Sequence, residues 1–308
     1  MPTAPSTVKI LHSSDGTVIY AEATGDPQPT RRAALRLWLN GCVFDDLCAN
    51  ARLLQMLYIV RYDVRGHGRS GKSNTAEAYV SKLFADDFKT VMDAFDLDKP
   101  VLEHGRYVGN LDSSVAALTC MIFAIPVAVA TDVVTHLAPG TLSGVSSLAG
   151  IPSTGTILAQ MAAPELVAAL PGLIQTADVR AYGAAGAIFI DKCFAHPDTV
   201  SYAVRCMYQG HSLTPEIMEL SLNRPMDVEN LWRAGEAGLP LLVVQGTADG
   251  HRACAEKTVE EVTKPHFKNY AAVWLEGRGH AVHYECLELE DVVDNMIAFA
   301  TKCGGKVS

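Results

Sequence analysis

Short apolar runs that end in a polar or glycine-containing turn recur along this chain, and they constrain its fold more than any other feature. The first half of the sequence contains LRLWLNG, LYIVRYD and PVLEHG, and the helical pattern VSKLFADDFKTVMDAF separates the last two. The second half contains LSGVSSLAGI, PLLVVQG and AAVWLEG and closes with the helical pattern LEDVVDNMIAFA. Strands that alternate with helices predict an α/β fold, with a mostly parallel central sheet flanked by helices.

The start of the chain predicts a different element. The segment VKILHSSDGTVIYAE has two β-rich runs on either side of Asp15 and Gly16. Glycine accepts the positive φ of a tight hairpin turn without steric cost. We therefore expect two antiparallel strands to precede the parallel ones.

A long span without any strand pattern interrupts the alternation. Between residues 153 and 230, stretches such as ILAQMAAPELVAAL and SYAVRCMYQG favour several short helices. The sequence thus predicts a core domain made of residues 1–152 and 231–308, with a helical insert at 153–230. The apolar run VAALTCMIFAIPVAVA contains Pro126 and is shorter than a bilayer-spanning helix. We expect a buried helix there, followed by a break at the proline.

Composition limits the partners of the chain. It carries a formal net charge of -9 with acidic and basic residues intermixed, which offers no basic surface to a nucleic acid. The eight cysteines lack the close pairs of a zinc site, so we expect free, mostly packed thiols and neither a metal nor another cofactor. The opening MPTAPSTVKI lacks the features of a secretory signal. We expect a cytoplasmic monomer or homodimer that binds a small molecule and neither nucleic acid nor membrane.

Four motifs together resemble the α/β-hydrolase superfamily. YDVRGHGRSGKS, GRYVGN, VVQGTADG and LEGRGHAVHYE follow one another in the order and spacing of that family, and the resemblance covers nearly the whole chain. The first motif is similar to the turn after the family's fourth strand. There Gly66 and Gly68 would allow a tight backbone, while Arg65 and Ser70 would hold the loop. The resemblance implies the α/β-hydrolase fold, with the insert at 153–230 as a lid or cap.

The nucleophile elbow departs from the family pattern. The family has Gly-x-Ser-x-Gly, and this chain has Gly105-Arg106-Tyr107-Val108-Gly109. A phenol has a pKa of about 10, so forming phenolate at neutral pH costs roughly 4 kcal/mol before a base helps. Its oxygen also lies farther from the backbone than a serine oxygen. Tyr107 is therefore a substitute nucleophile, an acid–base group, or a plug in a decayed site.

The resemblance also implies a catalytic base and its acid partner. His280 follows the predicted strand AAVWLE, where the superfamily keeps its base, and Asp249 ends VVQGTAD, where the family's acid orients that histidine. A lone histidine is often structural, and an aspartate beside a glycine is an ordinary turn residue. We expect the two side chains to lie within hydrogen-bonding distance. His251 and Arg252 come next in the sequence and could be solvated loop residues.

Further positions near the elbow bear on the chemistry. The resemblance implies an oxyanion hole formed by the backbone amides of Cys42 and Val108. Glu103 and His104 occupy the strand that leads to the elbow, where a central parallel strand is ordinarily apolar. Because buried polar groups need partners, these two are either a structural hydrogen-bonded pair or an extension of the active site.

These residues leave three functions open. The first is an ester or lactone hydrolase for a small, mainly apolar substrate, with Tyr107, His280 and Asp249 as an altered triad. The second is a lyase, cyclase or decarboxylase in which His280 and Tyr107 move a proton. The third is a binding protein that has lost the reaction. Retention of His280 and Asp249 favours an enzyme, and we rank the hydrolase first.

Overall fold

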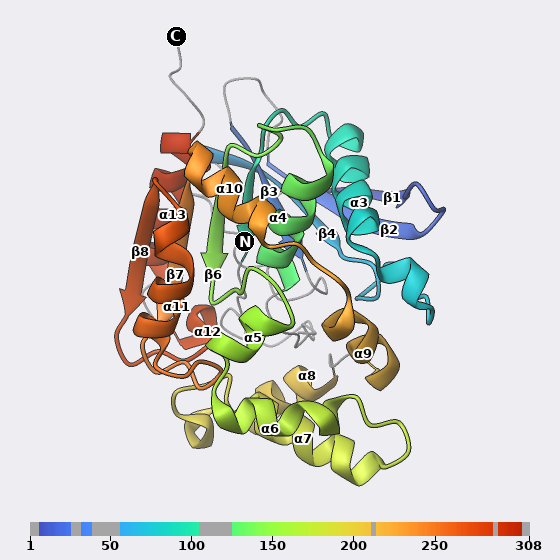
Figure 1. Ribbon diagram of the computed structural model, residues 1–308, viewed down its shortest axis with the longest axis vertical. Helices are drawn as coiled ribbons and strands as arrows, with labels where there is room; N and C mark the ends of the chain where they lie inside the picture. Colours follow the sequence, from blue (N-terminus) through green and yellow to red (C-terminus); the bar gives the residue numbers. More distant parts are fainter. Residues whose placement is uncertain are drawn as a thin grey trace.

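The central sheet has eight strands in the order β1-β2-β4-β3-β5-β6-β7-β8 (Figure 1). The computed structural model describes residues 6–25, 32–38, 56–104, 125–210, 214–285 and 289–303. The strands β1 and β2 are antiparallel, as are β2 and β4, and every other neighbouring pair is parallel. Their bounds are β1 Ser6–His12, β2 Val18–Thr24, β3 Arg32–Trp38, β4 Leu57–Asp63, β5 Val101–His104, β6 Gly144–Leu148, β7 Leu241–Gly246 and β8 Tyr270–Leu275.

The hairpin expected at the start of the chain is present. The strands β1 and β2 pair from Ser6 opposite Thr24 to His12 opposite Val18. Gly16 adopts a φ of +83° in the turn, and the backbone N–H of Thr17 donates to Asp15 Oδ1 at 3.0 Å. The Asp-Gly pair therefore makes the turn that its local chemistry favours.

Helices cover both faces of the sheet. Tyr62 on β4 lies toward α3 and α4, whose Asp87 and Asp132 are its charged neighbours. Gly144 on β6 lies toward α13, because a side chain there would meet the ring of Phe299 at 3.2 Å. The helices associated with the core are η1 Ala76–Tyr79, α3 Ser81–Ala94, α4 Ile125–His136, α10 Glu229–Ala237, α11 Ala255–Thr263, η3 Lys264–His266, α12 Val282–Glu285 and α13 Leu289–Cys303.

The described chain between β6 and α10 forms only helices and connecting loops, apart from one isolated bridge at Ala162. The helices α6 to α9 gather at one end of the molecule, toward which the arrows of β6 and β8 point (Figure 1). We call α5–α9 the helical insert; its elements are α5 Thr156–Met161, α6 Pro164–Leu173, α7 Val179–Asp191, η2 Pro197–Thr199, α8 Tyr202–Gly210 and α9 Pro215–Asn223. Helices were expected here; their action as a lid stays a prediction.

Pro126 lies in α4, which is described over Ile125–His136. The residues that precede this helix lie outside the described part of the chain, so the break expected at Pro126 stays a prediction. The described part of the chain contains no helix that is both long and apolar enough to cross a membrane.

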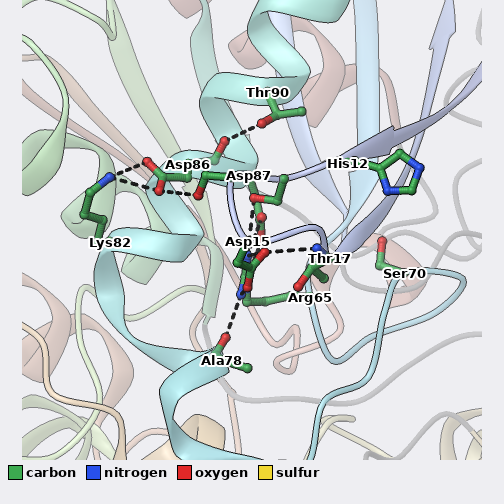
Figure 2. A network of polar contacts seen from close by, with 12 residues as sticks. His12, Asp15, Thr17, Arg65, Ser70, Ala78, Lys82, Asp86, Asp87 and Thr90 are labelled. Atoms are coloured by element: carbon green, nitrogen blue, oxygen red, sulfur yellow. Dashed lines mark hydrogen bonds and ion pairs between the residues drawn. The ribbon is translucent and has the colours of Figure 1, made fainter.

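Arg65 joins the turn after β4 to three other parts of the chain (Figure 2). Its guanidinium donates to Asp87 Oδ1 on α3 at 2.7 Å and to Asp15 Oδ2 in the hairpin turn at 2.9 Å. It also donates to the carbonyl oxygen of Ala78 on η1 at 2.7 Å. Because its side chain is only 2% exposed, these bonds are formed away from water, and Arg65 holds the loop as the sequence predicts.

The other residues of this turn also behave as expected. Gly66 and Gly68 adopt φ values of +82° and +46°, which residues other than glycine rarely adopt. A side chain at Gly66 would also come within 2.9 Å of Tyr79. Ser70 Oγ donates to the carbonyl oxygen of Asp63 at 2.5 Å and accepts from the N–H of Tyr20 at 2.9 Å.

A second buried ion pair joins the end of the insert to the core. Arg224, directly after α9, donates from Nη1 to Asp132 Oδ1 on α4 at 2.9 Å, and Nη2 lies 2.9 Å from Oδ2. The two side chains are 1% and 0% exposed. Ser81 Oγ donates to Asp132 Oδ1 at 2.6 Å, and the guanidinium lies 4.1 Å from the ring centroid of Phe84.

We expect Arg224→Ala to lower the free energy of unfolding by about 3–5 kcal/mol, because it strands the buried charge of Asp132. Urea unfolding measures the change. Lys89→Ala is the control, since Lys89 and Asp93 form an exposed pair that contributes about 1 kcal/mol at most. Equal effects of the two substitutions would contradict the prediction.

We expect His67 to make the protein less stable in acid. His67 is fully buried, its Nδ1–H donates to the carbonyl oxygen of Arg65 at 2.8 Å, and burial lowers its pKa to about 4. The folded state therefore favours neutral His67, and its contribution is present above pH 6.5 and lost as the pH falls toward 4. The loss reaches about 3 kcal/mol.

Urea unfolding between pH 7 and pH 4 tests this dependence by comparing the wild type with His67→Leu. The substitution should flatten the pH dependence by the stated amount, whatever its effect at pH 7. The exposed His12 provides the control, and His12→Gln should leave the slope unchanged. Parallel pH profiles of wild type and His67→Leu would refute the assignment.

Candidate active site

Asp249 and His280 meet at the carboxyl edge of the sheet. They follow β7 and β8, which are neighbouring parallel strands, so both loops leave the sheet at the same edge. His280 Nδ1 lies 2.9 Å from Asp249 Oδ2. The expected hydrogen bond is therefore present, and the catalytic role of the pair stays a prediction.

Asp249 is fixed by donors on both carboxylate oxygens. Gln245 Nε2 donates to Oδ2 at 2.5 Å, and the backbone N–H of His251 donates to Oδ1 at 2.7 Å. Burial alone would raise the pKa of Asp249, but the charge and hydrogen bond of His280, and then Arg252, hold it well below its ordinary value. The carboxylate therefore stays ionised, so His280 carries its proton on Nδ1 and leaves Nε2 for proton transfer.

The glycines of these two loops let the backbones approach closely. A side chain at Gly246 would lie 2.0 Å from the carbonyl oxygen of Arg278, and one at Gly279 would lie 2.5 Å from the nitrogen of Ala195. Glu285 on α12 accepts from the N–H of Ala195 at 2.6 Å and also from the N–H of Gly279. The loop that carries His280 is thereby packed against the insert.

His251 and Arg252 are buried, not solvated as the sequence suggested. They are 1% and 5% exposed. Arg252 pairs with Ala162 in an isolated β-bridge, and its Nη2 donates to the carbonyl oxygen of Ala149 at 2.8 Å. Residues of the insert, distant in sequence, cover this loop. The ring of His251 lies on that of His280, with centroids 4.1 Å apart and planes inclined by 31°.

The donor atoms of Asp249, His251 and His280 all lie within 4.8 Å of one another, which is close enough to consider a metal. Two ligands of one tetrahedral zinc ion lie about 3.4 Å apart, given metal–ligand bonds near 2.1 Å. The 2.9 Å separation between His280 Nδ1 and Asp249 Oδ2 is instead that of a hydrogen bond. His251 Nε2 lies 2.9 Å from the carbonyl oxygen of Phe189. In this arrangement the three residues form a hydrogen-bonded group, not a ligand set.

The positions predicted for the nucleophile and the oxyanion hole, Tyr107, Val108 and Cys42, lie outside the described residues. The strand β5 ends at His104 and β3 at Trp38, and these strands are parallel neighbours. Both therefore end at the edge where Asp249 and His280 meet. The roles of Tyr107, Val108 and Cys42 stay predictions.

The register of the sheet gives Glu103 charged and polar neighbours along the backbone. Glu103 lies opposite Arg36 on β3 and Ser146 on β6. Arg36 in turn lies opposite Arg61 on β4, and Arg61 forms a buried ion pair with Glu22 at 2.7 Å. One row across the sheet therefore carries, in order, Glu22, Arg61, Arg36, Glu103 and Ser146. Both interpretations of Glu103 stay predictions.

The described cysteines agree only in part with the expectation of packed thiols. The described cysteines that carry a thiol rather than a disulfide are Cys193, Cys206, Cys254 and Cys303. Cys193 is buried in the insert near His251, whereas Cys206 and Cys254 are exposed. Packing was therefore the wrong expectation for these two. A scattered cysteine in a helical pattern does not reveal which face of the helix it occupies.

A cavity lies at the opposite edge of the sheet from Asp249. It is bounded by α4, α10 and the segments that lead into β6 and β7, including Leu142 and Pro240. Arg233 on α10 also lines it. Since these segments enter the amino ends of the strands, the cavity is distinct from the site at the carboxyl edge.

No protein-family model and no curated protein matches the chain. Among solved structures, it is similar to a putative aryl esterase from Burkholderia cenocepacia, with 18% identity, 96% of this chain and 99% of that chain covered, and a TM-score of 0.74. An esterase from Rhodococcus sp. ECU1013 has 22% identity with the same coverages and TM-score. The 2-hydroxy-6-oxo-6-phenylhexa-2,4-dienoate hydrolase from Rhodococcus sp. strain RHA1 has 17% identity, 96% and 100% coverage and a TM-score of 0.65. Together with the sheet described above, these likenesses show that the chain has the α/β-hydrolase fold.

Proposed function

We propose that the chain is a hydrolase of carboxylic esters or lactones, in which Asp249 and His280 are the acid and base of an altered triad. The observation that carries the proposal is the buried 2.9 Å hydrogen bond between Asp249 Oδ2 and His280 Nδ1. It lies at the strand edge where ligands bind in open α/β sheets. The similar structures include proteins named esterase and hydrolase, which supports this class of reaction by analogy of fold alone.

The proton chemistry follows from the fixed tautomer. His280 Nε2 accepts a proton from the nucleophile as its oxygen attacks the ester carbonyl carbon. Asp249 stabilises the resulting imidazolium, because its carboxylate is held ionised beside Nδ1. The imidazolium then returns the proton to the leaving alkoxide when the carbon–oxygen bond of the ester breaks. In the second half of the reaction, His280 takes a proton from a water molecule as the water oxygen attacks the acyl carbon. The imidazolium returns the proton to the oxygen of the nucleophile when its bond to the acyl carbon breaks, which releases the carboxylic acid.

Tyr107 is the proposed nucleophile, since it occupies the central position of the elbow sequence after β5. Its attack would form an aryl ester, and the backbone amides of Val108 and Cys42 would stabilise the tetrahedral oxyanion. A phenolate is a better leaving group than a serine alkoxide, which favours rapid hydrolysis of that intermediate. The acid–base alternative has Tyr107 exchange a proton with His280 or with an attacking water, and it forms no acyl-enzyme.

The helical insert is proposed to act as a cap over this site and to select a small, mainly apolar substrate. It contacts both loops of the acid–base pair: the N–H of Ala163 donates to the carbonyl oxygen of His251 at 2.9 Å, and the N–H of Ala281 donates to that of Cys193 at 2.7 Å. Substrate pockets are lined mainly by apolar groups with a few placed polar ones. The insert's apolar composition fits that requirement.

We expect Asp249→Asn to lower kcat for p-nitrophenyl butyrate by about 10⁴-fold, because the amide no longer holds the reactive tautomer of His280. His280→Gln should lower it at least as much. Hydrolysis is followed by release of p-nitrophenolate, with the exposed Asp93→Asn as a control that should keep wild-type activity. Full activity in Asp249→Asn and His280→Gln would remove the proposed acid–base pair.

We expect Tyr107→Phe to abolish turnover of the same ester, while Tyr107→Ser keeps or increases it, because serine restores the family's nucleophile. Mass spectrometry of a quenched wild-type reaction should find the acyl group on the peptide that contains Tyr107. A loss of roughly 10²- to 10⁴-fold without an adduct would assign the acid–base role instead. Unchanged activity in Tyr107→Phe would contradict both roles.

A further inference from the structure

His251 is a second imidazole beside the proposed base, and the mechanism above gives its ring no task. Its ring centroid lies 4.1 Å from that of His280, with the planes 31° apart. The Nε2 atom of His251 points toward the insert and lies 2.9 Å from the carbonyl oxygen of Phe189 on α7. The ring of Phe189 also packs on that of His251, with centroids 4.4 Å apart. His251 therefore sits between the base and α7.

The hydrogen bond to Phe189 fixes the protonation of His251. A carbonyl oxygen only accepts, so Nε2 carries the hydrogen. Burial, reinforced by the charge of His280, lowers the pKa of His251 well below its ordinary value. The ring is consequently neutral, with its single proton on the side of α7.

The groups that face His251 come from several elements. Asp249 accepts from its backbone N–H at 2.7 Å and raises the pKa of the imidazole, whereas Arg252 lowers it. Cys193, which follows α7, has its Sγ 3.5 Å from Nε2. The ring of His280 is stacked on that of His251. Because a charge on His280 lowers the pKa of His251, the ring of His251 stays neutral when His280 gains a proton. The π face of a neutral ring attracts a stacked cation.

We propose that His251 is a positioning residue that stacks on His280, fixes the plane of its ring and stabilises its protonated form, while its bond to Phe189 ties this arrangement to the insert. The proposal rests on Asp249 and His280 being the acid–base pair of the proposed function. On this proposal, the position of α7 affects the orientation and the pKa of His280 through His251.

Two substitutions separate the ring from the hydrogen bond. His251→Gln keeps an N–H donor near the position of Nε2 and removes the ring. His251→Phe keeps an aromatic ring on His280 and removes the donor to Phe189. Cys193→Ala is the matched control, because it changes a buried neighbour of His251 Nε2 and keeps both the ring of His251 and its hydrogen bond to Phe189. Thermal unfolding of each variant establishes that it is folded.

The direct test is the pKa of His280, measured by NMR titration of the imidazole signals, with His280→Gln used to assign them. His251→Gln should lower this pKa by about 0.4–0.7 unit, which corresponds to the lower part of the range for cation–π contacts. His251→Phe and Cys193→Ala should leave it within about 0.2 unit of wild type, well inside that range. An unchanged pKa in His251→Gln, or an equal fall in His251→Phe, would overturn the proposal.

Kinetics give a second measurement. In His251→Gln, the acidic limb of the pH profile of kcat/KM should move down by the same interval, and kcat should fall about two- to five-fold. In His251→Phe, the limb should stay in place and KM should rise, since the bond to α7 is lost. A wild type without esterase activity would refute the proposed function, yet the NMR titration would still decide the role of His251.

Discussion

The ionised carboxylate of Asp249 is the constraint on which the rest of the site depends. A buried carboxylate is tolerated only where donors surround it. Here they come from the end of β7 through Gln245, from the following loop through the N–H of His251, and from the next loop through His280. Because each donor contacts a particular carboxylate oxygen, these hydrogen bonds fix the two loops relative to one another. The imidazole proton of His280 is then fixed as a consequence of packing.

The insert belongs to this arrangement as much as the core does. It is bonded to the loop of Asp249 at Ala163 and to the loop of His280 at Cys193, and the buried pair of Arg224 and Asp132 holds its end. A movement of the whole insert would break all of these contacts at once. On the proposed function, substrate access would therefore come through a part of the insert between these contacts, and α8 lies between Cys193 and Arg224 in the chain.

The sequence predicted those features that local patterns encode. Alternating strands and helices indicated the sheet, Asp15-Gly16 the hairpin, and the resemblance to the α/β-hydrolase superfamily the meeting of Asp249 with His280. The burial of His251 had no such signal, because the residues that cover it belong to the insert and are distant in sequence. The positions beside Glu103 likewise became visible only through the register of β3 and β5. Both features depend on contacts between segments that are distant in the sequence.

On the proposed function, a tyrosine at the elbow replaces the nucleophile and leaves Asp249 and His280 as the acid and the base. Within the described part of the chain, the orientation of His280 is set by Asp249 and by the donors to Asp249, Gln245 and the N–H of His251. A phenol, with a pKa of about 10, also releases its proton to an imidazole more readily than a serine hydroxyl does. The difference that a tyrosine makes to the site is therefore a distance, because its phenol oxygen lies farther from the backbone than a serine oxygen. With Tyr107 as the proposed nucleophile, the carbonyl carbon under attack would lie correspondingly farther from the backbone of the elbow than in an enzyme with a serine nucleophile. The insert, as the proposed cap, would have to accommodate that distance, and His251 connects the base to the same insert through α7.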